Sequence, residues 1–234
     1  MALHDGHRER LRGQFLADGL DGFSDIQVLE LLLFYSIARR DTNPIAHRLL
    51  DHFGSLAQVL EASPEELCRV EGVGENTAAY LHMIPQVCRR YQMDRTSNAR
   101  ILPTLESCAR YLQPFFFGQS AETVYLLCLD AKCKVLCCKK ISQGSVNAVD
   151  LPVRRIVETA LSSKAASVLL AHNHPGGMAI PSNEDISATL RAADVLRAVD
   201  VQLADHLIIC DDDYVSLMQS GYMTADMGEC GKDG

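Results

Sequence analysis

The sequence predicts an α/β domain built on a mixed sheet and preceded by a small all-α domain. From residue 4 to about residue 91 the chain shows helix-start signals and the helical spacing of apolar residues. After Gly118, short apolar runs with strand character alternate with helical segments. One run, 166–171, is apolar except for Ser167 and ends at His172 and His174. Strands that alternate with helices in this way are typical of an α/β domain.

Composition limits the possible classes of protein. At 234 residues the chain can form one large or two small domains, and its 47% hydrophobic and 22% charged residues are ordinary for a soluble globular protein. It has no run of about 18 apolar residues and no basic-then-apolar start, so we expect no membrane span and a cytoplasmic location. The nine cysteines are odd in number, which favours reduced, mostly buried thiols. Cys137 and Cys138, adjacent on a predicted strand, should face opposite sides.

Net charge argues against DNA as the main ligand. The formal charge is −8 and the isoelectric point is near 5.4, whereas proteins that hold DNA usually present a basic face. A local basic patch stays open as an alternative, with Arg8, Arg10 and Arg12 or Arg89 and Arg90 as its members.

The N-terminal domain is organised by helix starts. Three of them carry a suitable capping residue: Ser24, Asn43 before Pro44, and Ser63 with Pro64 next and Glu66 three residues later. Gly54 is expected to end the second helix. Pro85 is expected to kink or interrupt the last one.

The Gly72-Val73-Gly74 turn between two helices resembles a helix-hairpin-helix element. In DNA-binding elements of that kind, backbone N–H groups at the start of the second helix contact phosphate. Here Glu71 and Glu75 flank the turn, and residues 1–100 carry 11 Arg or Lys against 14 Asp or Glu, a balance of −3. These charges favour a helical hairpin used for packing or for protein contact.

Four segments follow from these patterns. We expect the all-α domain over 1–93, a polar linker over 94–101, the α/β domain over 102–223 and a disordered Gly- and Asp-rich tail over 224–234. The elements of the α/β domain are expected in this order: a helix over 105–112, strands over 123–129 and 134–141, a candidate third strand over 144–149, a helix over 152–161, the strand over 166–171, a helix over 186–196, and a hairpin of 201–210 with 214–217.

The two histidines at the end of the apolar strand form a candidate metal site. Side chains on a strand alternate faces, so His172 and His174 point to the same side. A Pro-Gly-Gly turn follows, and then a helix whose first turn holds Asp185. Two imidazoles and a carboxylate with room for a water are the arrangement of a catalytic zinc. The alternatives are half-buried strand histidines and a capping box between Ser182 and Asp185.

A metal hydrolase also needs a group that moves protons. The predicted strand over 123–129 is preceded by Glu122, which is a candidate for this role. The residues alone do not rank Glu122 above Glu158 or Glu184, although Glu184 is expected to face away from Asp185 on the helix.

The spacing resembles the JAMM (MPN-plus) metalloprotease motif: an upstream Glu, then HxH, then ten residues, then Asp. The wider context is similar to bacterial RadC proteins, through 141–145, 171–175, Pro181-Ser182-x-x-Asp185 and Asp205-His206-Leu207-Ile208-Ile209. The helical N-terminal half with its Gly-x-Gly turn also fits that family. Where the family commonly has Ser after His-Asn-His-Pro, this chain has Gly176, which loosens the turn without removing a ligand.

The resemblance implies a fold and a set of roles. The fold would be a mixed-sheet MPN (JAMM)-like metalloprotease domain after the helical domain. His172, His174 and Asp185 would bind one zinc ion per chain, Glu122 would be the general acid/base, and Ser182 would hold the oxyanion. We do not assign His206 as a metal ligand. It would either orient one of the metal-binding residues or be an ordinary hydrogen-bonded histidine of the sheet.

The function implied is zinc-dependent hydrolysis of amide bonds, peptide or isopeptide, in a peptide or protein substrate. The alternative is a non-catalytic DNA-repair-associated module that binds DNA or repair and replication proteins. Intact ligands together with Glu122 and Ser182 favour hydrolysis, and the acidic charge disfavours DNA. The sequence leaves the oligomeric state open.

Overall fold

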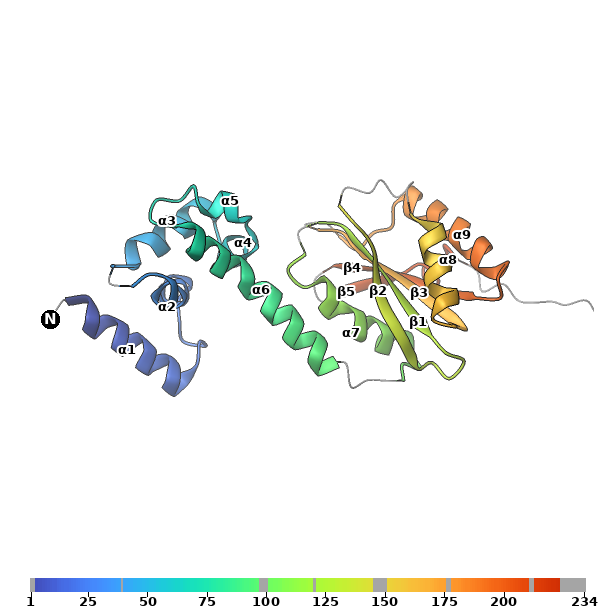
Figure 1. The fold of residues 1–234 in the computed structure, drawn as a ribbon, viewed down its shortest axis with the longest axis horizontal. Helices are drawn as coiled ribbons and strands as arrows, with labels where there is room; N and C mark the ends of the chain where they lie inside the picture. The colour runs from blue at the N-terminus through green and yellow to red at the C-terminus, as the bar shows by residue number, and fades with distance from the viewer. Residues whose placement is uncertain are drawn as a thin grey trace, which may run out of the picture. The chain divides into compact units, whose positions relative to one another are not determined.

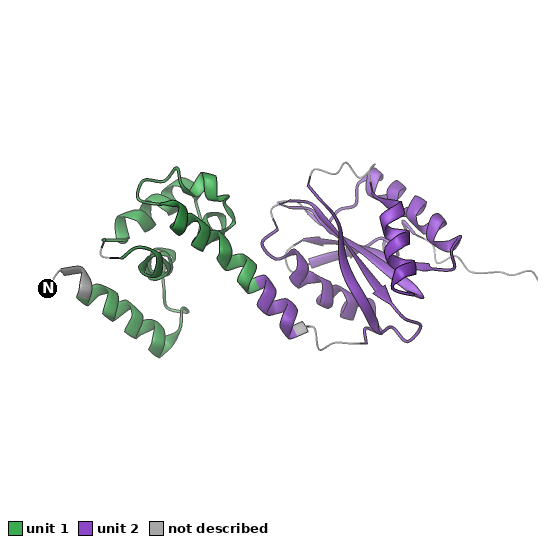
Figure 2. Ribbon diagram, viewed as in Figure 1, with its two compact units in different colours: residues 1–88 green, residues 89–234 purple. Residues whose placement is uncertain are grey.

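The computed structural model describes residues 3–38, 40–96, 101–119, 121–144, 151–175, 178–210 and 213–223. The chain divides into two compact units, Met1–Cys88 and Arg89–Gly234 (Figure 2). The division falls within one helix, α6 (Glu75–Thr96). Half of the predicted linker, residues 97–100, and the predicted tail over 224–234 lie outside the described residues. The domain boundaries drawn from the sequence therefore stay predictions.

The N-terminal unit is helical, as expected. Its other helices are α1 (Leu3–Asp18), α2 (Asp25–Ser36), α3 (Asn43–Phe53), α4 (Leu56–Glu61) and α5 (Pro64–Leu67). Apolar residues from α2 to α6 and the turns between them form one core, with Leu29, Leu49 and Leu81 fully buried. Ser63 forms the predicted capping box, Ser24 caps α2 as predicted and also forms a capping box with Gln27, and Gly54 ends α3. Thr42, not Asn43, is the N-cap of α3, because Asn43 already has helical geometry and Asp41 Oδ1 accepts its N–H.

The Gly72-x-Gly74 turn packs against α3. Gly72 has a φ of +97°, and a Cβ there would lie 3.0 Å from the Ile45 side chain, so this position favours glycine. Arg48 Nε donates to the carbonyl of Glu71 over 3.0 Å. The helix that follows, α6, continues through Pro85, so the expected interruption is wrong, while the alternative of a kink stays a prediction. A proline removes one backbone N–H donor, and burial of neighbouring α6 residues such as Leu81 offsets that loss.

The C-terminal unit holds a five-stranded mixed sheet. Its strands are β1 (Thr123–Leu129), β2 (Val135–Gln143), β3 (Ser167–Asn173), β4 (Gln202–Cys210) and β5 (Asp213–Ser216), in the order β2-β1-β3-β4-β5. Only the β3–β4 pair is parallel among the paired strands of the described chain. The mixed α/β sheet predicted from the sequence is confirmed. Residues 145–149 of the candidate third strand lie outside the described ranges.

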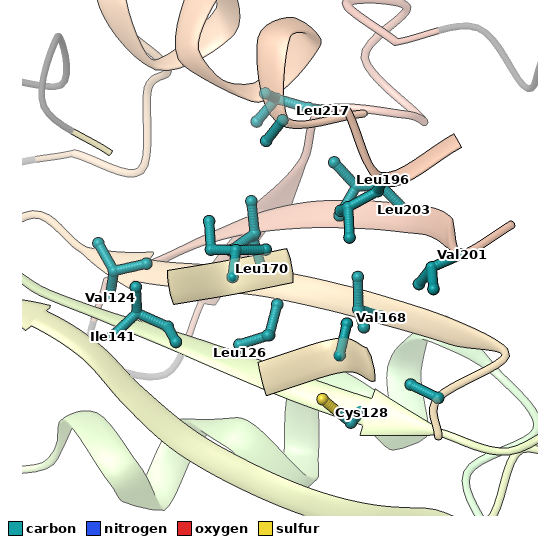
Figure 3. Packing of buried hydrophobic residues seen from close by; sticks show 14 of the residues in the cluster. Val124, Leu126, Cys128, Ile141, Val168, Leu170, Leu196, Val201, Leu203 and Leu217 are labelled. Carbon is teal, nitrogen blue, oxygen red and sulfur yellow. The ribbon is translucent and has the colours of Figure 1, made fainter. Parts of the chain in front are cut away.

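Helices cover both faces of this sheet. The helices α8 (Val153–Ser162) and α9 (Asn183–Arg197) lie on one face, and α7 (Leu105–Phe116) lies on the other (Figure 1). Alternate residues of β3 therefore enter two cores: Val168 and Leu170 pack toward α8 and α9, and Leu169 and Ala171 pack toward α7. Figure 3 shows the first core, where Leu170 lies among side chains from neighbouring strands and α9. Any side chain that continues the Val168–Leu170 face emerges beside the start of α9.

One irregularity in β4 decides which way its polar residues point. Val168 pairs with Leu203, but Leu169 pairs with Asp205, so Ala204 is an extra residue in β4. Beyond this bulge the alternation is regular, and His206 pairs with Leu170. Paired residues share a face, so His206 points toward α8 and α9.

The described cysteines are free thiols. Cys137 packs against the core under α8 and α9, whereas Cys138 packs against the core under α7, as predicted for neighbours on a strand. Within the described ranges, no helix combines the length and the apolar character needed to cross a membrane.

Candidate metal centre

Strand β3 carries two histidines to one point. His172 continues the buried face of Val168 and Leu170, and its side chain is 2% exposed. His174 follows just beyond the strand, and its side chain is 25% exposed. The Nε2 atoms of the two rings lie 2.8 Å apart. The prediction that both side chains point to the same side is confirmed.

Asp185 reaches the histidines from the first turn of α9. Its Oδ1 lies 3.4 Å from His172 Nε2, and its Oδ2 lies 3.6 Å from His174 Nε2. Ser182, the N-cap of α9, also donates to Oδ2 from its backbone N–H (2.9 Å) and from its hydroxyl (2.6 Å). The capping box and the histidine cluster were competing interpretations of the sequence, but the carboxylate serves both because it has two oxygens.

Glu122 completes the cluster from the position just before β1, the strand next to β3. Val124 pairs with His172, so extending this antiparallel register by two residues aligns Glu122 with His174. Ligand atoms of Glu122, His172, His174 and Asp185 all lie within 4.8 Å of one another. Burial raises the pKa of Glu122, the nearby Asp185 raises it further, and His174 opposes the shift.

The donor set fits a metal ion. Two nitrogens bound tetrahedrally to one zinc at 2.0–2.1 Å are separated by about 3.4 Å. The separations among His172 Nε2, His174 Nε2 and the Asp185 oxygens, 2.8–3.6 Å, lie around that value. Two imidazoles and one carboxylate suit zinc and other first-row transition ions. The cluster could therefore hold a metal ion with three ligands, leaving Glu122 beside it.

The buried histidines are held in the neutral form that binds metals. Burial lowers the pKa of His172 to about 4, against the opposing effect of Asp185. Burial also lowers the pKa of His206 well below its ordinary value, and His172 and His174 add to that shift. A neutral imidazole has one ring nitrogen free to coordinate a metal.

His206 lies directly behind His172. Its Nε2 is 2.8 Å from His172 Nδ1, and its Nδ1 is 2.6 Å from the hydroxyl of Thr189 on α9. Thr189 in turn donates to the main-chain carbonyl of Asp185 over 2.6 Å. Of the two interpretations of His206 from the sequence, these contacts favour a residue that orients a ligand. Thr189 carried no sequence signal beyond its place one helical turn after Asp185.

Asn173, between the two histidines, is a residue that sequence reasoning missed. It faces the opposite side of the sheet, where its Oδ1 accepts the backbone N–H of Thr123 over 2.8 Å. Its Nδ2 donates to the carbonyls of Gln119 (3.4 Å) and Ala121 (3.3 Å). Asn173 thus holds the segment that carries Glu122. The available signal was an amide within a buried strand, since such a group needs partners.

The other candidate acids lie away from the cluster. Glu158 pairs with Arg154 on the surface of α8, with 2.8 Å between Oε1 and Nε, and Glu184 is exposed on α9. Of the three acids left open by the sequence, the structure brings Glu122 alone to the histidines. A pocket opens at this point, and these residues line it: Glu122, Val124, Leu151, His172, Asp185, Ala188 and His206.

Comparison with known proteins gives consistent similarities over both units. Residues 102–222 match a family described as RadC-like JAB domain, and residues 6–79 match one described as UPF0758 N-terminal. A UPF0758 protein of Fusobacterium nucleatum is 32% identical over 225 residues, which cover 93% of this chain and 97% of the relative. A UPF0758 protein of Ruegeria pomeroyi is 33% identical over 217 residues, with the same shares of the two chains.

Proposed function

The chain belongs to the RadC family, and from this membership together with its cluster of acids and histidines we propose that it is a zinc-dependent hydrolase of amide bonds. The observation that carries the proposal is the convergence of Glu122 with His172, His174 and Asp185. A structural metal site would need no acid with a raised pKa beside its ligands. A general acid/base does need one, because its proton affinity must suit both taking and returning a proton.

In this proposal His172, His174 and Asp185 hold one zinc ion per chain. Zinc supplies Lewis acidity there, lowering the pKa of a water to about 7 and polarising the scissile carbonyl. Glu122 takes a proton from the attacking water and returns one to the departing amine. Burial and the negative charge of Asp185, which raise the pKa of Glu122, support this exchange. The substrate is a peptide or isopeptide bond in a peptide or protein.

Ser182 would donate to the oxygen on which negative charge develops. Its hydroxyl now donates to Asp185 Oδ2, so it would have to rotate about the Cβ–Oγ bond to reach a substrate. After that rotation the carboxylate still accepts the Ser182 N–H. A donor placed in this way supports the developing charge without leaving Asp185 unpaired.

Metal analysis combined with a cleavage screen tests the proposal. We expect about one zinc per purified chain and cleavage of some members of a library of peptides and isopeptide-linked peptides. Glu122→Gln should keep the zinc and the fold but lower turnover by about 10²- to 10⁴-fold, since it removes proton transfer alone. Glu184→Gln, at an exposed acid next to Asp185, is the matched control and should cleave like the parent. Full activity of Glu122→Gln would exclude the assigned role.

A further inference from the structure

The partner of His172 is unusual for a metal-binding histidine. Such a histidine generally donates its second ring N–H to a carboxylate, a carbonyl or a water. Here the partner is a second imidazole, His206, at 2.8 Å. A carbonyl can only accept a hydrogen bond, whereas either ring nitrogen of an imidazole can donate or accept. Something beyond His206 must therefore decide which of the two rings donates.

That group is Thr189, whose hydroxyl has one hydrogen but makes two hydrogen-bond contacts. Thr189 Oγ1 makes two contacts of 2.6 Å, one with the carbonyl of Asp185 and one with His206 Nδ1. Each contact is at hydrogen-bond distance and needs one hydrogen. The carbonyl has none to give and the hydroxyl has one. The hydroxyl must therefore donate to Asp185, and the second hydrogen must sit on His206 Nδ1.

The tautomers of both rings follow from this assignment. Both side chains are buried, with residue exposures of 3% for His206 and 1% for His172, which favours neutral rings with one hydrogen each. His206, with its hydrogen on Nδ1, has a bare Nε2 and accepts from His172 Nδ1. His172 then has a bare Nε2, the atom that faces His174 and Asp185.

We propose that His206 and Thr189 are positioning residues that fix His172 in the Nδ1–H tautomer, so that its Nε2 lone pair faces the metal. This inference rests on the proposed function in one respect, since it takes His172 as a ligand. The chain of hydrogen bonds starts at the main chain of Asp185 and ends at His172. Asp185 and His172, two of the proposed ligands, are thus also connected by hydrogen bonds through Thr189 and through His206 of β4.

The tautomer can be read in the metal-free protein. With ¹⁵N in the histidine rings, long-range ¹H–¹⁵N spectra distinguish a protonated ring nitrogen from a bare one, and the His172 signals are those lost in His172→Gln. We expect His172 to carry its hydrogen on Nδ1. In Thr189→Val the hydroxyl is gone, so His206 gains by moving its hydrogen to Nε2 and donating to His172. We expect His172 to shift toward the Nε2–H form, which faces the Asp185 carboxylate.

Zinc affinity gives a second readout. Thr189→Val leaves every metal ligand in place, yet it should weaken Zn²⁺ binding, measured by competition with a chromogenic chelator, by about 10-fold or more. Thr189→Ser keeps the hydroxyl and should restore both the parental tautomer and the parental affinity. Thr159→Val, the same substitution at a buried threonine of α8, controls for packing and should change neither.

Two results would overturn the inference. One is a parent protein whose metal-free His172 is protonated on Nε2, and the other is a Thr189→Val variant with the tautomer and zinc affinity of the parent. The proposed function fails separately. A parent that binds no Zn²⁺, or that binds it and cleaves no amide, would contradict the proposed hydrolase, while the spectra would still decide the tautomer.

Discussion

The two units use the same helix-start motif for different purposes. In the N-terminal unit, Ser63 and Glu66 form a capping box at the start of α5, and in the C-terminal unit Ser182 and Asp185 form one at the start of α9. Glu66 is exposed, and its hydrogen bonds with Ser63 lower its pKa. Asp185 is buried beside two histidines. The motif is the same, so the surroundings of the carboxylate decide whether it can also bind a metal.

The two units also differ in how many polar side chains they bury. Among the described residues of the N-terminal unit the buried polar side chains are Glu30, Thr42 and Thr77. The C-terminal unit buries a larger set, much of it connected around the cluster: Thr123, Thr159, His172, Asn173, Asp185, Thr189, Asp205, His206 and Ser216. Burying a polar group is unfavourable unless it is paired, so a connected set of this kind points to a site.

The largest expected difference comes from removing the acid of each capping box. Asp185→Ala should abolish stoichiometric zinc, with a loss of affinity beyond the roughly 100-fold that follows removal of a group that only orients a ligand. Glu66→Ala should leave zinc binding unchanged. Metal analysis and chelator competition on both variants measure the contrast. Parental zinc in Asp185→Ala would remove Asp185 from the ligand set.

Acid should next lower the folding stability of the C-terminal unit in the metal-free protein. Burial lowers the pKa of His172 to about 4. Between about pH 6.5 and pH 4 this side chain therefore binds a proton in the unfolded chain but not in the folded chain. Stability is therefore complete above about pH 6.5 and is lost as the pH falls toward 4, by on the order of 3 kcal/mol for this group. Urea unfolding at pH 7 and pH 4.5 measures the loss. His172→Gln should remove the share of this pH dependence that comes from His172 and leave the share from His206, whose pKa burial also lowers. An unchanged dependence would argue against the assignment to His172.

Asn173→Ala sharpens the comparison within the C-terminal unit. It leaves the N–H of Thr123 without its acceptor, so we expect a loss of about 1–3 kcal/mol in the free energy of unfolding. Zinc affinity should fall much less than in Asp185→Ala, because the amide faces the other side of the sheet. Asn183→Ala, at an exposed asparagine of α9, is the matched control and should be nearly neutral. A loss of zinc as large as that in Asp185→Ala would mean that Asn173 acts on the ligands themselves.

The smallest effects should come from the capping serines. Ser63→Ala and Ser182→Ala each remove one side-chain cap and should each destabilise the protein by about 1 kcal/mol, read from thermal or urea unfolding. Only Ser182→Ala should also lower amide cleavage, because only its hydroxyl lies at the cluster. Equal cleavage by the two variants would leave Ser182 as a capping residue alone.

Local patterns predicted what depends on near neighbours in the chain. The face shared by His172 and His174 follows from strand alternation, the cap at Ser24 follows from its residue type, and the capping boxes at Ser63 and Ser182 follow from spacing. The RadC family and its mixed α/β sheet were also predicted from motifs and are confirmed.

Contacts between distant segments were not predictable in the same way. The residues alone did not rank Glu122 first among the acids, because its place beside His174 depends on the register of β1 against β3. The partners of Asn173 and Thr189 depend on that register and on the packing of α9 over β4. The role of His206 depended on the bulge at Ala204, because regular alternation from Leu203 would have turned His206 toward α7.

That bulge has a consequence for comparing chains of different length. The extra residue, Ala204, has no pairing partner of its own in β3, so a chain lacking it could keep Leu203 opposite Val168 and His206 opposite Leu170. A deletion at this position would make β4 regular without moving the histidine that faces His172. A one-residue gap here, between a relative and this protein, therefore carries no functional meaning, whereas a gap between His206 and the end of β4 would shift the strand against its neighbours.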